Sequence, residues 1–147
     1  MRFTLKVACP KYYARNCCDV INIDKIIVYN SVYNFMNLKR THKKFIKFVD
    51  KSSSDQKIIF ISTSSQKESW YVHYKQVAEA YLLTNHSNSL ILRFPLFIGK
   101  GPVLGFKNKT MVPYGKMELI SVGDAAHEVV QKIYYNGNVR CFTFRGE

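Results

Sequence analysis

Lys57-Ile-Ile-Phe-Ile-Ser-Thr63 is a continuous run of β-branched and aromatic residues with polar residues on both sides. This composition predicts the clearest strand of the chain. The polar loop Thr63-Ser-Ser-Gln-Lys-Glu-Ser69 comes next, and ligands bind at this end of a strand in open α/β sheets. A helix is predicted over residues 71 to 84, and Ser89-Leu-Ile-Leu-Arg-Phe94 is the next strand. Strand and helix therefore alternate, which is typical of a parallel α/β sheet.

Upstream of this core, residues 18 to 23 form a short apolar run, which we interpret as a buried parallel strand. Residues 25 to 33 are rich in Ile, Val and Tyr and favour a strand, although Asn30 and Ser31 would also suit a helix cap. From Phe35 to Lys51 the periodicity predicts an amphipathic helix with a basic outer stripe.

Downstream, residues 95 to 115 contain three of the four prolines and four of the seven glycines. We expect an irregular connection close to a ligand there. A last helix is predicted to begin near Asp124 as its N-cap, and Asn136-Gly137 turns the chain into a final strand over residues 139 to 144.

The composition bounds the class of protein. With 147 residues, 47% hydrophobic and 22% charged, the chain is expected to form a single globular domain over residues 1–147. No run of 18 apolar residues and no convincing signal sequence is present, so we expect a cytoplasmic protein that is not bound to a membrane. The four cysteines form no Cys-x-x-Cys pair, which argues against a zinc site and for free thiols.

The formal net charge is +12, which favours a phosphate-bearing partner. Nucleic acid, an anionic membrane surface and a phosphorylated small molecule all fit this charge. The abundance of Lys, Asn, Ile and Tyr is also what an AT-rich genome would produce. The basic stripe from Arg40 to Lys51 is, in the same way, either a solvated helix face or a binding surface.

Tyr71-Val-His-Tyr-Lys75 carries the most specific chemistry in the chain. A tyrosine and a lysine four residues apart share one face of a helix. An ammonium there lowers the pKa of the phenol, which can then exchange a proton with a carbinol oxygen. Because the chain has 10 tyrosines and 22 basic residues, the same spacing also arises by chance on an ordinary helix.

Six short segments occur in the order known from one protein family. They are Asp19-Val-Ile-Asn22, Asn37-Leu-Lys-Arg-Thr41, Ile61-Ser-Thr63, and residues 71 to 79, 92 to 99 and 119 to 126. Together they resemble the extended short-chain dehydrogenase/reductases of the NAD-dependent epimerase/dehydratase type, and within that family the dTDP-4-dehydrorhamnose reductases. The resemblance implies an α/β fold with a partial Rossmann-like, doubly wound parallel sheet, with residues from about 95 to 147 as the remaining substrate region.

The resemblance also implies roles for individual residues. Thr63, Tyr71 and Lys75 would be catalytic, with Thr63 or its neighbour Ser64 holding the substrate oxygen. NAD or NADP would contact Lys75, Asn37 and Pro95. Ser64, Arg93 and Gly99 would contact a nucleotide-sugar substrate, and no metal is implied. Each residue also has an ordinary structural reading, as a loop cap, a salt-bridged strand residue or a turn residue.

The sequence departs from the family pattern in two places, and both affect whether a cofactor and an active site are expected. No glycine occurs before Gly99, so the Gly-rich strands that cradle the pyrophosphate are missing from residues 1 to 17. Only seven residues separate Thr63 from Tyr71, which makes Tyr74 an alternative phenol. Without the cradle we expect NAD(P) to bind weakly or not at all.

Three hypotheses result. The first in order of preference is a degenerate, N-terminally shortened relative that acts as a binding or regulatory module. Its exposed sheet edge would contact a protein partner or a second copy. The alternative is an active nucleotide-sugar reductase or epimerase that uses Tyr71 and Lys75. A further alternative is nucleic-acid binding through the basic helix.

Overall fold

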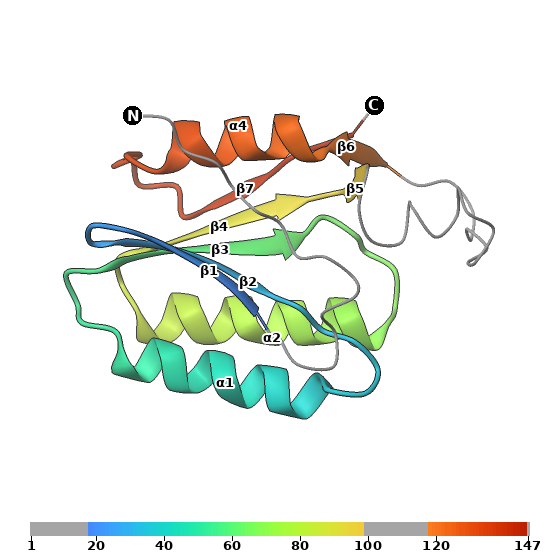
Figure 1. The fold of residues 1–147 in the computed structure, drawn as a ribbon, viewed down its shortest axis with the longest axis horizontal. Helices are drawn as coiled ribbons and strands as arrows, with labels where there is room; N and C mark the ends of the chain where they lie inside the picture. Colours follow the sequence, from blue (N-terminus) through green and yellow to red (C-terminus); the bar gives the residue numbers. More distant parts are fainter. Residues whose placement is uncertain (1–17, 99–117, 147) are drawn as a thin grey trace.

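The computed structural model describes residues 18–98 and 118–146 (Figure 1). The strands are β1 (Cys18–Ile23), β2 (Ile26–Ser31), β3 (Lys57–Thr63), β4 (Ser89–Phe94), β5 (Leu96–Ile98), β6 (Leu119–Ser121) and β7 (Cys141–Thr143). The helices are α1 (Leu38–Lys51), α2 (Trp70–Asn85) and α4 (Val122–Lys132).

The main sheet has the strand order β1-β2-β3-β4-β7. β2, β3, β4 and β7 run parallel, and β1 pairs with β2 in the antiparallel direction. β5 and β6 form a separate parallel pair. α1 and α2 cover one face of the sheet and α4 covers the other, which gives three layers (Figure 1). The predicted α/β, partial Rossmann-like fold class is confirmed.

β3 is the centre of this arrangement because its side chains are buried on both faces. Ile58 and Phe60 pack against the layer of α1 and α2, where they meet Phe45 and Leu82. Ile59 and Ile61 point the other way and join a second core with residues of α4. The clearest strand in the sequence is therefore the strand that separates the two cores.

The prediction of a buried parallel strand over residues 18 to 23 is wrong. β1 and β2 form a hairpin in which Ile23 pairs with Ile26, so only two residues connect the strands. Asp24 has φ 52°, a left-handed conformation that Asp tolerates better than most residues. Val20 is 41% exposed. The strand that runs parallel to β3 and leads into α1 is β2, which settles residues 26 to 31 as a strand rather than a helix cap.

Several element boundaries differ from the prediction. The N-cap of the last helix is Ser121, whose hydroxyl accepts the N–H of Asp124 at 3.0 Å, and Asp124 lies in the first turn. β5 lies inside the segment that was expected to be irregular, because Leu96 to Ile98 pair with β6. The final strand is limited to Cys141–Thr143. In α2, the apolar Val77 is exposed, whereas the polar Lys75 and Glu79 are buried.

Among the described residues, no helix combines the length and the apolar character that crossing a membrane requires.

Phe45→Ala should lower the free energy of unfolding by about 3 to 5 kcal/mol. The Phe45 ring is fully buried and lies 5.2 Å from the Tyr29 ring and 4.9 Å from the Phe60 ring, between centroids, so its loss leaves a cavity. Urea unfolding of the purified variants measures the effect. The exposed neighbour Lys44→Ala should change stability by less than about 0.5 kcal/mol. Equal losses in the two variants would contradict this packing.

Candidate functional site

The candidate site lies where β2, β3 and β4 end at one edge of the sheet, beside the start of α2. The loop after β3 is fixed by short local bonds. Thr63 Oγ1 accepts the Ser65 N–H at 3.1 Å, and the Ser64 N–H donates to the Phe94 carbonyl at 3.0 Å. Ser69 caps α2 by accepting the Val72 N–H at 3.1 Å. Both predicted hydroxyl residues, Thr63 and Ser64, are half-buried at this edge.

Lys75 is only 1% exposed. Its Nζ donates to the Ile61 carbonyl at 2.8 Å and to Asn30 Oδ1 at 3.1 Å. Three rings surround the same atom, with centroids at 5.0 Å for Phe60 and 5.8 Å for both Tyr33 and Tyr71. Carbonyl and amide oxygens with ring faces replace the water that a buried ammonium would otherwise require. Lys75 therefore ties α2 to β2 and β3.

Tyr71 stands over this lysine and is 41% exposed. The structure brings the predicted pair together, and Tyr33 lies beside it. The Tyr33 ring centroid is 6.5 Å from that of Tyr71 and 5.5 Å from that of Tyr74. Burial raises the pKa of Tyr33 to about 12, with smaller contributions from the two neighbouring phenols, while the Ser31 hydroxyl acts in the opposite direction.

Sequence reasoning missed Tyr33 as a member of this group. Its available signal was its position two residues beyond the end of β2, at the edge where ligands bind in such sheets.

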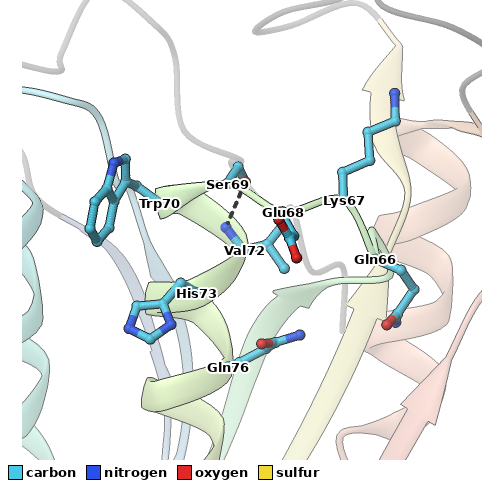
Figure 2. A pocket seen from close by; sticks show the side chains of 8 residues that line it. All are labelled: Gln66, Lys67, Glu68, Ser69, Trp70, Val72, His73 and Gln76. Atoms are coloured by element: carbon cyan, nitrogen blue, oxygen red, sulfur yellow. Dashed lines mark hydrogen bonds between the residues drawn. The ribbon is translucent and has the colours of Figure 1, made fainter.

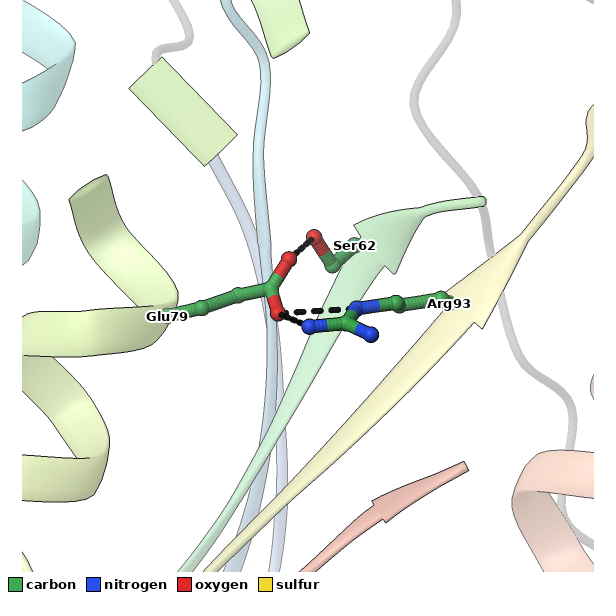
Figure 3. A network of polar contacts seen from close by, with 3 residues as sticks. All are labelled: Ser62, Glu79 and Arg93. Atoms are coloured by element: carbon green, nitrogen blue, oxygen red, sulfur yellow. Dashed lines mark hydrogen bonds and ion pairs between the residues drawn. The ribbon is translucent and has the colours of Figure 1, made fainter. Parts of the chain in front are cut away.

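Glu79 organises a second buried polar group, shown in Figure 3. Its Oε2 accepts the Ser62 hydroxyl at 2.6 Å. Its Oε1 accepts Nε and Nη2 of Arg93 at 2.9 Å and 2.6 Å. The bond to Glu79 raises the pKa of the Arg93 guanidinium. This arrangement joins α2 to β3 and β4. It agrees with the structural alternative for Arg93, that of a salt-bridged strand residue. The role of Arg93 toward a substrate stays a prediction.

The remaining predicted residues lie around this edge. Asn37 is buried at the start of α1, where its Oδ1 accepts the Asn34 N–H at 3.0 Å and its carbonyl accepts the Thr41 N–H at 2.9 Å. It orders the turn into α1. Pro95 is buried between β4 and β5. Gly99 lies outside the described residues.

A hollow of about 650 Å³ opens beside the loop after β3 and the first turns of α2 (Figure 2). Its lining is Gln66, Lys67, Glu68, Ser69, Trp70, Val72, His73 and Gln76. None of the predicted residues Thr63, Tyr71 and Lys75 lines it. Within the described ranges, no group of three or more His, Cys, Asp or Glu residues is placed to hold a metal ion.

No protein-family model and no curated protein sequence matches the chain. Solved structures do match. A dTDP-glucose 4,6-dehydratase from Bacillus anthracis, in complex with NAD, superposes with a TM-score of 0.59 at 16% identity, over 84% of this chain and 52% of that one. A UDP-glucuronic acid 4-epimerase from Bacillus cereus, in complex with UDP-glucuronic acid and NAD, gives 0.55 at 17% identity, over 76% and 46%.

The chain thus spans about half the length of these two neighbours. At this level of identity the likeness concerns the fold alone.

Glu79→Gln should lower the free energy of unfolding by about 1 to 3 kcal/mol, because Arg93 then loses its carboxylate partner. The loss stays below that of a fully buried pair since the Arg93 side chain is 36% exposed. Urea unfolding at neutral pH measures it. Glu128→Gln on α4, which removes the same charge from a half-exposed site, is the control and should change little. An equally small effect of both variants would contradict a structural role of Glu79.

Tyr33→Phe should flatten the pH dependence of stability in alkali. Below about pH 10 the phenol keeps its proton in both states. Between about pH 10 and about pH 12 the unfolded chain releases it while folded Tyr33, with a pKa of about 12, does not. The free energy of unfolding therefore falls as the pH rises, by up to about 3 kcal/mol from this group.

Urea midpoints measured across this interval should fall less steeply for Tyr33→Phe than for Tyr134→Phe, which alters an exposed phenol. Parallel slopes for the two variants would show that Tyr33 ionises normally.

Proposed function

We propose that this protein is a non-catalytic binding or regulatory module, built on the fold of the NAD-dependent epimerases and dehydratases and descended from such an enzyme. The observation that carries this proposal is the direction of β1.

In a doubly wound dinucleotide-binding sheet, the strand order 3-2-1-4-5-6 pairs the fourth strand with the first. The first strand is parallel, and its Gly-rich turn at the carboxyl edge cradles the pyrophosphate. Here β2 leads into the Asn37 helix and pairs with β3, as the fourth strand does. Its other neighbour is β1, which is antiparallel, so the chain leaves β1 at the opposite edge of the sheet. The position next to β2 that a parallel first strand would take is therefore held by the antiparallel β1.

The enclosure of Lys75 supports the same proposal. An ammonium that orients a nicotinamide ribose needs an open path to the cofactor. In this protein the Lys75 side chain is almost completely excluded from solvent, and Tyr33, Phe60 and Tyr71 surround its Nζ. A ribose would have to displace one of these rings. In this proposal the lysine serves the fold by holding α2 on β2 and β3.

The contact surface of such a module includes the edge of the sheet. Within the part of the chain that the structure describes, no strand pairs with the outer side of β1. A protein partner or a second copy of the chain would bind there by adding a strand.

The second candidate function is an active nucleotide-sugar reductase or epimerase with NAD or NADP. It is favoured by Tyr71, which is partly open to solvent with Lys75 directly behind its ring. In that case Tyr71 would transfer the proton, Thr63 or Ser64 would hold the substrate oxygen, and Arg93 and Gly99 would border the sugar. Asn37 and Pro95 would lie next to the cofactor.

Titration of the purified protein with NADH and NADPH, followed by nicotinamide fluorescence, separates the two candidates. We expect no saturable binding at millimolar cofactor, for the wild type and for Lys75→Met alike. Saturable binding that is lost in Lys75→Met and kept in Lys132→Met, which removes a lysine from α4, would overturn the proposal in favour of the enzyme. Circular dichroism of both variants establishes that they are folded.

A further inference from the structure

We propose that the outer surface of α1, together with a row of rings that leads from α1 to the tip of α2, binds single-stranded nucleic acid. This surface is called the α1–α2 face below. It does not involve Tyr71 or Lys75, so the proposal stands independently of the one above.

The charge on the α1–α2 face is strongly one-sided. Basic residues make up six of the fourteen residues of α1, namely Lys39, Arg40, Lys43, Lys44, Lys47 and Lys51, and all six are exposed. Asp50 is the one acidic residue of this helix. α2 adds no exposed charge because Lys75 and Glu79 are both buried. None of the five lysines of α1 takes part in an ion pair among the described residues.

This arrangement costs the isolated helix stability. Lys39, Lys43 and Lys47 are spaced four residues apart, as are Arg40 and Lys44, and like charges at this spacing repel by a few tenths of a kcal/mol per pair. The first turn holds no acidic residue, so its cations also face the positive end of the helix dipole. A polyanion along α1 relieves both repulsions, and a nucleic-acid backbone is a linear polyanion.

The second half of the surface is aromatic. His42 of α1 lies 5.7 Å from Tyr74 of α2, Tyr74 lies 5.8 Å from His73, and His73 lies 6.2 Å from Trp70, between ring centroids. The row becomes more exposed toward its end, where Trp70 is 64% exposed and projects at the start of α2 (Figure 2). Basic residues beside exposed rings are the combination that holds unpaired bases, because the rings stack on bases while the cations hold phosphates.

The same observations argue against two other polyanionic ligands, a membrane surface and duplex nucleic acid. A helix that lies on a membrane inserts its apolar face into the lipid, but the apolar residues Phe45 and Val49 of α1 are already buried against the sheet. Within α1 itself no large apolar residue is exposed; Phe35 and Met36, which are exposed, precede the helix and are not part of its basic stripe. In a duplex the bases are stacked on each other, so Trp70 would have no free base to contact.

Trp70 is the only tryptophan of the chain, so its fluorescence reports directly on the proposed stacking. We expect oligouridine and oligothymidine of about 12 nucleotides to quench this fluorescence saturably, a length within the usual range for one such surface. A duplex of equal length should bind more weakly and leave the fluorescence largely unchanged. Vesicles with phosphatidylserine should not compete at equal anionic charge.

Variants separate the charge from the rings, with binding followed by the anisotropy of a labelled oligonucleotide. The triple change Lys39→Gln, Lys43→Gln and Lys47→Gln should reduce the slope of log affinity against log salt by about 2, at about 0.7 per lost phosphate contact. The matched control Lys25→Gln, Lys132→Gln and Arg145→Gln removes three charges from other parts of the surface and should keep most of the slope. Trp70→Ala should weaken binding by about 5- to 100-fold, and Trp70→Phe should recover most of it.

Three outcomes would overturn the proposal. Equal slopes for the two triple variants would mean that the net charge of the whole chain is responsible. Binding of inorganic polyphosphate as tightly as oligouridine, with no effect of Trp70→Ala, would reduce the surface to an unspecific cation patch. Tighter association with phosphatidylserine vesicles than with the oligonucleotides would identify it as a membrane contact.

Discussion

Burial of β3 on both faces is the constraint from which the rest of the architecture follows. A strand that presents Ile58 and Phe60 to one side and Ile59 and Ile61 to the other must be covered twice. The apolar faces of α1 and α2 supply one cover and α4 supplies the other. Parallel pairing with β2 and β4 follows, because the helices that cover the sheet also connect its strands.

Two buried polar side chains of α2, Lys75 and Glu79, hold this helix at the carboxyl edge of the sheet. α2 turns Lys75 and Glu79 toward the strands, and each finds its partners on the strand ends: carbonyl and amide oxygens for the ammonium, Ser62 and Arg93 for the carboxylate. The position of α2 over the sheet is therefore set by directional bonds as well as by apolar packing.

Local patterns in the sequence were sufficient to predict the strands and helices of the central core. β3, β4 and the amphipathic α1 stand within a few residues of their predicted limits, since each has a strong periodicity or an unbroken β-branched run. The direction of β1 was not readable, because an apolar run of six residues fits either orientation and the turn at Asp24 contains no glycine. In the site, the contact of Tyr71 with Lys75 follows from helical spacing. The enclosure by Tyr33 depends on pairing between distant segments, which no local pattern encodes.

The hairpin of β1 and β2 also bears on how the chain reaches its fold. Its strands close over a loop of two residues, so little chain entropy is lost before they pair. The pairing of β2 with β3 must wait for the whole of α1 to be placed, which makes it a long-range contact and a slower one. The hairpin at the edge of the sheet consequently has the contacts of shortest sequence separation. It is able to form before the core that it borders.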